Sequence, residues 1–248
     1  MKRILFLIFF LTFLFDGIGQ RNKTIPGERT YCKKLTVLLN SHSYDPVFDL
    51  NISKGKDTVS MQLIQVYGKE FIAKNPSLKM RIPQTISNRK ILLGVRLIHG
   101  MSKPDLISNG VYLRRKSVRI MINSNDDFLI DGKISHLDSI QKIVENYFST
   151  IGTDYEYPET FEQSKIIIKW DENTTQYCFE QTLKRICYGY LNLIENNSNL
   201  SICRMSVKEM KELRIKFPLN ILLILNESLP LEEVIIVKDS VVIPIKTE

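Results

Sequence analysis

The sequence lacks the residue patterns that most often mark a catalytic or metal-binding site. Its three histidines, His42, His99 and His136, are far apart in the chain, and no cysteine pair or Cys/His group has the spacing of a zinc site. Neither a glycine-rich phosphate loop nor a serine nucleophile elbow is present. We therefore predict no catalytic residues, no cofactor-binding residues and no metal ligands, and a protein that is not an enzyme.

Two pairs of neighbouring acids are the remaining candidates for acid–base chemistry. Asp126 precedes Asp127, and Asp171 precedes Glu172. Both pairs fall where a turn or the start of a helix is expected, and carboxylates are favoured at both kinds of position. We interpret them as structural residues.

Long apolar runs are also scarce, and the longest lies at the N-terminus. Lys2 and Arg3 precede the apolar residues 4–15, and Asp-Gly-Ile-Gly-Gln follows. This order is typical of a secretory signal peptide, and the run falls short of the ~20 residues that a membrane-spanning helix needs. We expect Sec-dependent export with cleavage after Gly19, and a periplasmic or secreted protein. The alternative is a short uncleaved anchor that holds the chain at the inner membrane, facing the periplasm.

The chain has only four cysteines, and export would permit them to form disulfides. Cys178 and Cys187 lie on one expected helix, about 13–14 Å apart along its axis, which is too far for a disulfide. Cys187 and Cys203 would approach each other if this helix packed on the following strand, whereas Cys32 stands alone. The sequence leaves the disulfide state open, and small buried thiols are the simplest interpretation.

The net charge of +7 is concentrated in residues 89–119. The segment contains one acidic residue, Asp105, and eight basic residues: Arg89, Lys90, Arg96, Lys103, Arg114, Arg115, Lys116 and Arg119. A solvated connector explains such a run, and contact with an anionic cell wall or lipid is the functional alternative. Tyr112 is the only aromatic residue in the segment, so stacking on nucleobases, and with it nucleic acid as a partner, is not expected.

Residues 35–110 alternate apolar and polar side chains in several short stretches, which favours a β-rich region that includes much of this basic connector. The expected strands are 35–40, 47–53, 58–67, 71–73, 78–83 and 91–98. The second and third would form a hairpin around the turn 54–57. We expect the fifth strand to end at Pro83.

Residues 118–203 carry the clearest local signals, in the order strand, strand, helix, strand, helix, strand. Strands are expected at 117–124, 128–131, 165–170 and 200–203. The first helix would begin with a capping box of Ser135 and Asp138, and the second with Asn173 and Gln176. The second helix has the expected buried stripe Phe179, Leu183, Ile186, Tyr190 and Leu193. A third helix would start with the capping box of Ser206 and Glu209 and end before Pro218.

These patterns divide the 248 residues into five expected segments. They are a signal peptide or short anchor (1–19), a flexible leader (20–34), the β-rich region with the basic connector (35–110), an α+β domain (111–220) and a C-terminal hairpin (221–248).

The order of elements resembles the periplasmic domain of the ExbD/TolR family of biopolymer-transport proteins, in a divergent form like that of Bacteroidetes members. Val-Arg-Ile-Met-Ile-Asn-Ser-Asn-Asp-Asp-Phe-Leu-Ile-Asp-Gly-Lys (118–133) is similar to that family's strand, turn and returning strand. Residues 166–170 look like its next strand, 78–84 like its Leu-Pro strand, and 206–220 like a charged helix that ends in an aromatic–Pro step. The transmembrane helix with its ion-coupling Asp has no equivalent, because Asp16 lies at the far end of a short apolar run.

The resemblance implies an α+β fold of ββαβαβ order, with two helices on one face of a small mixed sheet, preceded here by the β-rich region. It implies interaction rather than chemistry: homodimerisation, ExbB- or TonB-like envelope partners, and strands that add to a partner's sheet. We therefore expect an exported, non-enzymatic protein–protein interaction module of the cell envelope, related to energy-transducing transmembrane transport. The alternative is a secreted or periplasmic β-rich binding or adhesion protein.

Overall fold

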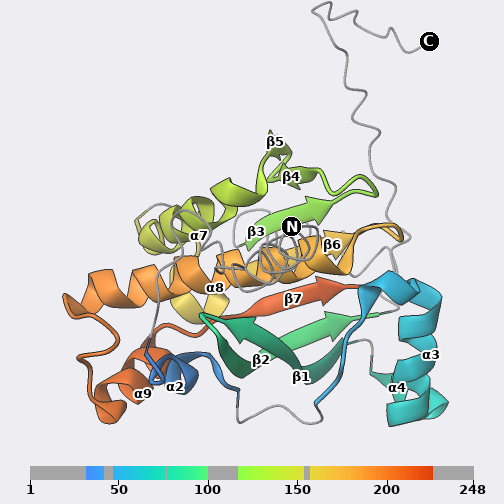
Figure 1. Cartoon of the computed structure of the whole chain (residues 1–248), viewed down its shortest axis with the longest axis horizontal. Coiled ribbons are helices and arrows are strands. Elements are labelled where there is room, and N and C mark those ends of the chain that lie inside the picture. Colours follow the sequence, from blue (N-terminus) through green and yellow to red (C-terminus); the bar gives the residue numbers. More distant parts are fainter. Residues whose placement is uncertain (1–31, 42–46, 76, 100–116, 154–156, 226–248) are drawn as a thin grey trace, which may run out of the picture. The chain divides into compact units, whose positions relative to one another are not determined.

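A mixed sheet of seven strands runs through the part of the chain that the computed structural model describes, residues 32–41, 47–75, 77–99, 117–153 and 157–225 (Figure 1). The strands are β1 (Ser77–Ile86), β2 (Arg89–Ile98), β3 (Ser117–Ile122), β4 (Phe128–Ile130), β5 (Lys133–Ser135), β6 (Lys165–Trp170) and β7 (Ile221–Ile224). The α-helices are α2 (Leu35–Leu39), α3 (Lys56–Tyr67), α4 (Lys69–Lys74), α7 (Ile140–Ser149), α8 (Gln176–Ser198) and α9 (Val207–Lys216). Short 3₁₀ turns occupy Ile52–Lys54, Leu137–Ser139 and Phe161–Gln163. The expected α+β class is confirmed.

The strand order is β1-β2-β7-β6-β3-β4-β5. The four central strands, β2, β7, β6 and β3, run parallel, and antiparallel pairs close the sheet on both sides. The central strands of a parallel sheet are buried on both faces, so their sequences are continuous apolar runs. The three isoleucines of β6 and the sequence Ile-Leu-Leu-Ile of β7 fit this rule, and all of them are buried.

Helix α8 covers one face of the sheet. In Figure 1 it lies roughly in line with β7, and α7 lies beside it. Trp170 of β6 and Phe179 of α8 bring their rings within 5.2 Å of each other, centroid to centroid. The whole predicted stripe of α8, at steps of three and four residues, is buried, as expected from its periodicity.

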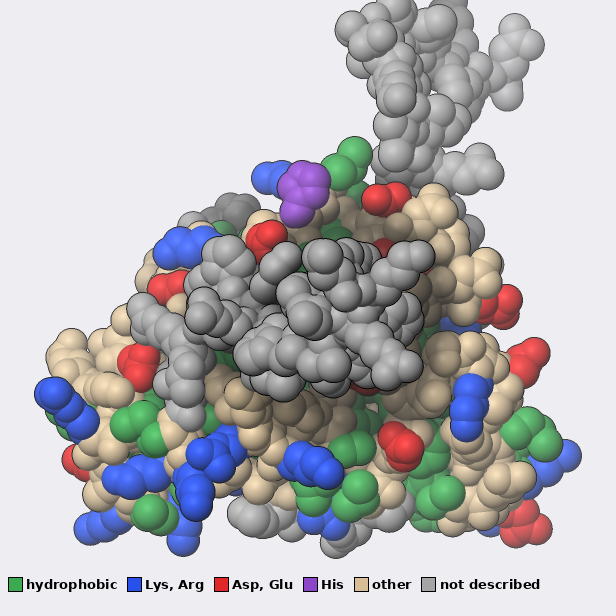
Figure 2. Space-filling view, in the orientation of Figure 1, with side chains coloured by type: hydrophobic (Ala, Val, Ile, Leu, Met, Phe, Trp, Pro, Cys, Tyr) green, Lys and Arg blue, Asp and Glu red, His purple; other side chains and the backbone are tan. Residues whose placement is uncertain are grey.

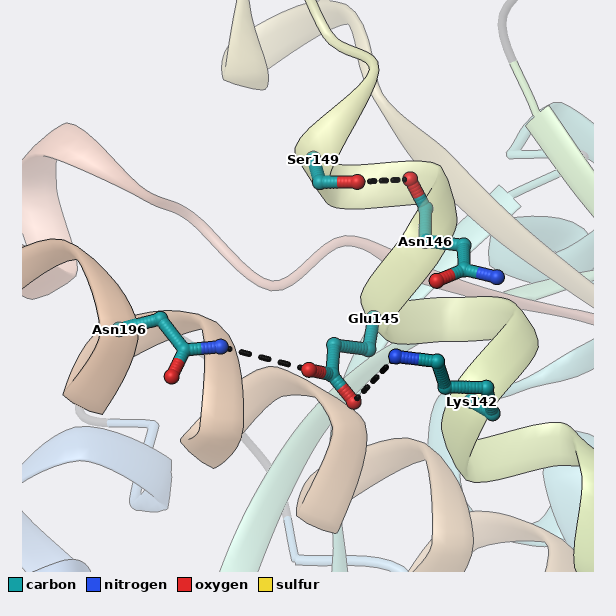
Figure 3. A network of polar contacts seen from close by, with 5 residues as sticks. All are labelled: Lys142, Glu145, Asn146, Ser149 and Asn196. Carbon is teal, nitrogen blue, oxygen red and sulfur yellow. Dashed lines mark hydrogen bonds and ion pairs between the residues drawn. The ribbon is translucent and has the colours of Figure 1, made fainter.

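Helix α7 packs closely along α8. Gly189 of α8 lies so near to α7 that a Cβ atom there would come within 2.7 Å of the Gln141 carbonyl oxygen. At the rim of this contact, Asn196 Nδ2 donates to Glu145 Oε1 at 3.3 Å, and Lys142 Nζ lies 3.7 Å from the other carboxylate oxygen (Figure 3). The two helices therefore form one layer.

The predicted strands between residues 35 and 74 are wrong. Residues 35–40 begin with helix α2, 58–67 belong to α3, and 71–73 to α4. In α3 the two buried side chains, Val59 and Leu63, are four residues apart, which is helical spacing. Gly55 and Gly68 precede and follow the helix with φ near +80°, a conformation that glycine adopts most readily. Within residues 35–110, which we expected to be β-rich, the described strands are therefore β1 and β2.

Strand β1 continues through Pro83, where we expected it to end. The carbonyl of Arg81 accepts a hydrogen bond from Phe48 N at 2.8 Å, so the backbone groups of Arg81, and of Pro83 two residues later, point away from β2. Proline has no N–H to donate, and an outward position on an edge strand requires none.

Several helix boundaries also differ from the prediction. Ser135 makes no capping box, because it ends the short edge strand β5, which the sequence did not suggest. Thr175, rather than Asn173, caps α8 by accepting from Cys178 N at 3.1 Å. The capping box of Ser206 and Glu209 is confirmed.

The expected strand 200–203 is also wrong, because these residues form a turn, and β7 supplies the final strand instead. The expected hairpin within 221–248 falls after residue 225, outside the described residues. The expected signal peptide, residues 1–19, also lies outside them. Because β7 lies between β2 and β6, one sheet draws strands from three of the five expected segments.

Candidate interaction surface

The β1–β2 hairpin carries basic side chains and no acidic one. Its charged residues are Lys79, Arg81, Arg89, Lys90 and Arg96. Side chains alternate between the faces of a strand, so the buried residues of β1 at 78, 80, 82 and 86 face the core, and Lys79 and Arg81 lie on the opposite face. The register places Lys90 and Arg96 on that same face. We call these four residues, Lys79, Arg81, Lys90 and Arg96, the basic hairpin surface.

The register brings like charges together on this surface. Lys79 pairs directly with Arg96, and such a cross-strand pair of like charges is destabilising. Lys79, Lys90 and Arg96 are exposed, and Arg81 is half-buried. Because four cations share one face of the hairpin, the surface is a candidate for contact with an anionic partner.

The same face of the sheet continues from β2 across the parallel strands. Beside the hairpin, it presents a cluster of four buried aliphatic residues: Ile98, Ile167, Leu222 and Ile224. Beyond the cluster, the register adds Lys165 and Lys169 of β6 and Arg119 of β3. Cations therefore lie on both sides of an aliphatic centre.

The predicted basic segment 89–119 is placed only in part. Lys90, Arg96 and Arg119 lie on this face, whereas Lys103 and residues 114–116 are outside the described residues. Lys79 and Arg81 precede the predicted segment in the sequence, and the hairpin register places them on the same face as Lys90 and Arg96. The signal for them was the alternation of apolar and basic residues in Leu-Lys-Met-Arg-Ile at 78–82.

The edges of the sheet are poorly suited to adding a partner strand. On β1, Phe48 N binds the Arg81 carbonyl, the Tyr67 hydroxyl lies 3.5 Å from the Lys79 carbonyl, and Pro83 has no donor. The other edge, β5, has three residues, and one of them is Lys133. Short, charged or proline-containing edges resist pairing. The side chains of the basic hairpin surface are therefore a better candidate for partner contact than the strand edges.

Three of the four paired acids, Asp126, Asp127 and Asp171, make local hydrogen bonds. Asp126 accepts hydrogen bonds from Thr175 N at 2.9 Å and from Thr175 Oγ1 at 2.7 Å, next to the start of α8. Asp127 accepts from Asn123 Nδ2 at 3.1 Å in the β3–β4 turn. Asp171 donates its own backbone N–H to the Ile122 carbonyl at 3.0 Å.

Two of the three histidines, His99 and His136, lie in the described residues. His99 is buried, and burial lowers the pKa of its imidazole, whereas His136 is exposed and His42 lies outside the described residues. No group of three or more His, Cys, Asp or Glu side chains in the described ranges is arranged to hold a metal ion.

A cavity of about 130 Å³ lies between α2, β2, α8 and α9. Its wall includes Leu38, Leu93, Tyr190 and Arg214. Arg214 Nη1 donates to the Val37 carbonyl at 3.3 Å, and Tyr190 Oη donates to the Phe217 carbonyl at 2.8 Å. These two polar groups serve to hold the surrounding elements together.

Cys32 and Cys203 form a disulfide, with Cα atoms 5.6 Å apart. This is not the Cys187–Cys203 pairing that the sequence made conceivable. Cys178 and Cys187 are free and buried, and burial raises the pKa of each thiol to about 12, so neither is a reactive thiolate near neutral pH. Among the helices within the described ranges, none combines the length and apolarity that a bilayer span requires.

No protein-family model matches the chain, and no curated protein or solved structure matches it either.

Proposed function

We propose that this chain is an exported, non-enzymatic interaction module of the cell envelope that engages an anionic partner through its basic hairpin surface. The observation that carries the proposal is the cross-strand pair of Lys79 and Arg96, flanked by Arg81 and Lys90 on a hairpin without acids. A surface that concentrates like charge in this way is stabilised when a partner supplies the opposite charge.

The Cys32–Cys203 disulfide supports export. Structural disulfides form and persist in oxidising compartments such as the periplasm and the extracellular space. The basic and apolar start of the sequence is typical of a signal peptide for the same route. The two features are independent, since Cys32 and Cys203 both lie outside the N-terminal pattern.

The order of elements supports a relationship to ExbD/TolR-type biopolymer-transport proteins. From β3 onward the order of strands and α-helices is β3, β4, β5, α7, β6, α8, α9 and β7, which is similar to the family order apart from β5, α9 and a final strand that follows α9 in place of residues 200–203. On this proposal the partners are ExbB- or TonB-like envelope proteins, and a second copy of the chain. The family relationship rests on the order of elements, whereas the anionic contact rests on the positions of the cations in the structure.

The first test is binding of the purified chain to isolated cell envelopes at increasing salt. We expect Lys90→Glu with Arg96→Glu to abolish binding, and wild-type binding to weaken as salt screens the contact. The matched control is Lys208→Glu with Lys211→Glu, two exposed lysines that belong to α9 and not to the hairpin. Envelope binding that is equally tight for the hairpin variant would refute the anionic contact.

The family relationship has its own test. A photo-crosslinker at Lys90 should capture an ExbB- or TonB-like protein in living cells, and the same group at Lys211 should not. Adducts that consist only of extracellular ligands would instead favour the secreted binding or adhesion alternative.

A further inference from the structure

The cavity between α2, β2, α8 and α9 has a cation in its wall and no acidic residue. Among the described residues that line it, Arg214 alone is charged. Leu38 and Leu93 make part of the wall apolar, and both are buried. Arg214 and residues 218–220, which also line the cavity, are half-exposed, so a small molecule can enter from solvent.

Ser41, which follows α2, brings a buried hydroxyl to the wall of this cavity. The residue is only 7% exposed. Its backbone is fixed to β2, because Ser41 N donates to the Leu92 carbonyl at 2.9 Å and Leu92 N donates to Asn40 Oδ1 at 2.8 Å. Within the described part of the chain, the Ser41 hydroxyl makes no hydrogen bond. A buried hydroxyl without a partner is costly, so this group is suited to a ligand that supplies one.

The Arg214 guanidinium also has unused donors. Its Nη1 donates to the Val37 carbonyl of α2 at 3.3 Å, which holds the group beside the cavity. Throughout the described ranges, Arg214 makes no other hydrogen bond and no ion pair. A guanidinium carries five N–H donors in a planar arrangement that fits a carboxylate with two parallel hydrogen bonds. Arg214 can therefore bind an oxyanion while it keeps its contact with α2.

Gly94 of β2 also lines the cavity, and its backbone N–H points away from β1. The register pairs Gly94 with Arg81, whose carbonyl points away from β2. In an antiparallel ladder, both members of such a pair direct their backbone groups outward. Along β2, Gly94 lies between Leu92, which is bonded to Ser41, and Arg96, where the pairing with β7 begins. Its N–H is thus a further donor on the cavity side of β2.

The surroundings of the cavity are basic as well. Figure 2 shows that Lys and Arg side chains predominate over the part of this view where α2 and α9 lie. Clustered cations raise the local concentration of small anions and so speed their binding.

We propose that this cavity binds a small monocarboxylate, such as propionate or butyrate. The carboxylate accepts hydrogen bonds from the Arg214 guanidinium, the Ser41 hydroxyl and the Gly94 N–H, and the aliphatic chain lies against Leu38 and Leu93. The volume of about 130 Å³ is close to that of cavities that admit benzene, which allows about six non-hydrogen atoms. One cation balances a monoanion, whereas a phosphate dianion would keep an uncompensated charge. The inference is independent of the proposed function, which concerns the hairpin.

The test is isothermal titration calorimetry of the purified chain with acetate, propionate and butyrate. Ligands of this size bind with a Kd on the order of 1 mM in a matched site. Butyramide has the shape of butyrate without its charge, and we expect it to bind at least about tenfold more weakly. Butyrate should also raise the midpoint of thermal unfolding, because it binds only the folded chain. Inorganic phosphate is the competing oxyanion, and we expect no binding.

Ser41→Ala removes the hydroxyl and little else. It should weaken butyrate binding by about tenfold, because a hydrogen bond to a charged acceptor is lost. Without ligand, the unfolding midpoint should stay at the wild-type value, since the hydroxyl has no partner to lose within the described residues. The matched control is Ser201→Ala, an exposed serine in the turn between α8 and α9 that does not line the cavity, and it should bind as wild type does.

Arg214→Gln removes the cation and should weaken butyrate binding by about tenfold or more. Its control is Arg204→Gln, at an exposed arginine of the same turn that is not part of the cavity wall. If Arg214→Gln does not fold, Ser41→Ala and butyramide still decide the question.

Three results would overturn the inference. The first is butyrate binding that is as tight in Ser41→Ala as in wild type, which would place the ligand elsewhere. The second is butyramide binding equal to that of butyrate, because the charge would then not be recognised. The third is binding of phosphate without any binding of the monocarboxylates, which would assign the site to another class of anion. None of these results bears on the envelope contact of the hairpin.

Discussion

At the scale of single residues, His99 is a titratable group buried without full compensation. It follows β2, its side chain is 8% exposed, and its Nε2 atom has no hydrogen-bond partner among the described residues. Burial lowers the pKa of the imidazole, and a hydrogen bond with the backbone of Asn75 opposes this effect in part. Neutral imidazole is therefore the form that suits the folded chain.

This arrangement predicts a loss of stability in mild acid. Between its lowered folded pKa and its ordinary value near ~6.5, His99 binds a proton in the unfolded chain but not in the folded one. Its contribution is complete above ~6.5 and is lost as the pH falls below that value. His99→Gln should flatten the decline in unfolding free energy between about pH 7 and pH 5, measured by urea denaturation. His136→Gln, at an exposed histidine, should decline as wild type does, and a His99→Gln curve parallel to wild type would contradict the argument.

At the scale of elements, the α7–α8 contact depends on Gly189. Glycine in the middle of a helix costs about 1 kcal/mol relative to alanine, so local propensity alone would favour Ala. The tertiary contact opposes this preference, because a Cβ atom would lie 2.7 Å from the Gln141 carbonyl oxygen and 2.9 Å from Val144 Cγ1. The close approach of the two helices therefore requires glycine.

Gly189→Ala should lower the free energy of unfolding by about 1–3 kcal/mol, the usual cost of overpacking a core. Gln181→Ala, on the same helix but half-exposed, should stay within about 0.5 kcal/mol of wild type. Adding Val144→Ala to Gly189→Ala should restore only part of the lost free energy of unfolding, because the clash with the Gln141 backbone remains. Denaturant unfolding measures all four proteins, and a Gly189→Ala variant that is more stable than wild type would show that α7 moves freely.

At the scale of the whole molecule, the disulfide joins residues 171 positions apart. It ties the segment that leads into α2 to the turn between α8 and α9. Around it, Lys34 Nζ donates to the Met205 carbonyl at 2.9 Å, and Arg214 binds the Val37 carbonyl. Closing so long a loop restricts the unfolded chain, which stabilises the fold by about 2–5 kcal/mol.

Thiol alkylation checks this bond directly. In denaturant without reductant, the exported protein should take up label at Cys178 and Cys187 only, and after reduction at all four cysteines. Cys32→Ser, Cys203→Ser and the double variant should each lose about the same 2–5 kcal/mol, because each removes the same cross-link. Four labelled thiols without reductant would refute the disulfide and weaken the case for export.

Local patterns predicted the elements whose signals lie within a few residues. The buried stripe predicted α8, the three isoleucines predicted β6, and the capping box of Ser206 predicted the start of α9. Each of these signals depends on residues that are close together in the sequence. The same reasoning failed for α3, where two buried positions in a mixed sequence do not distinguish a helix from a strand. It failed also for β7, because a short apolar run has no period to read.

For the basic hairpin surface, too, the sequence showed the residues but not their arrangement. The sequence displayed its cations as separate members of two stretches, and only the register of β1 with β2 placed Lys79 opposite Arg96.

The sequence by itself determined the helices and strands that have a clear period or cap, since these follow from interactions along a short stretch of backbone. Tertiary structure decided which strands are neighbours, with β7 between β2 and β6, and it decided that Cys32 bonds Cys203. Such choices minimise the apolar surface and the unpaired backbone groups left in the whole chain, so no single segment encodes them.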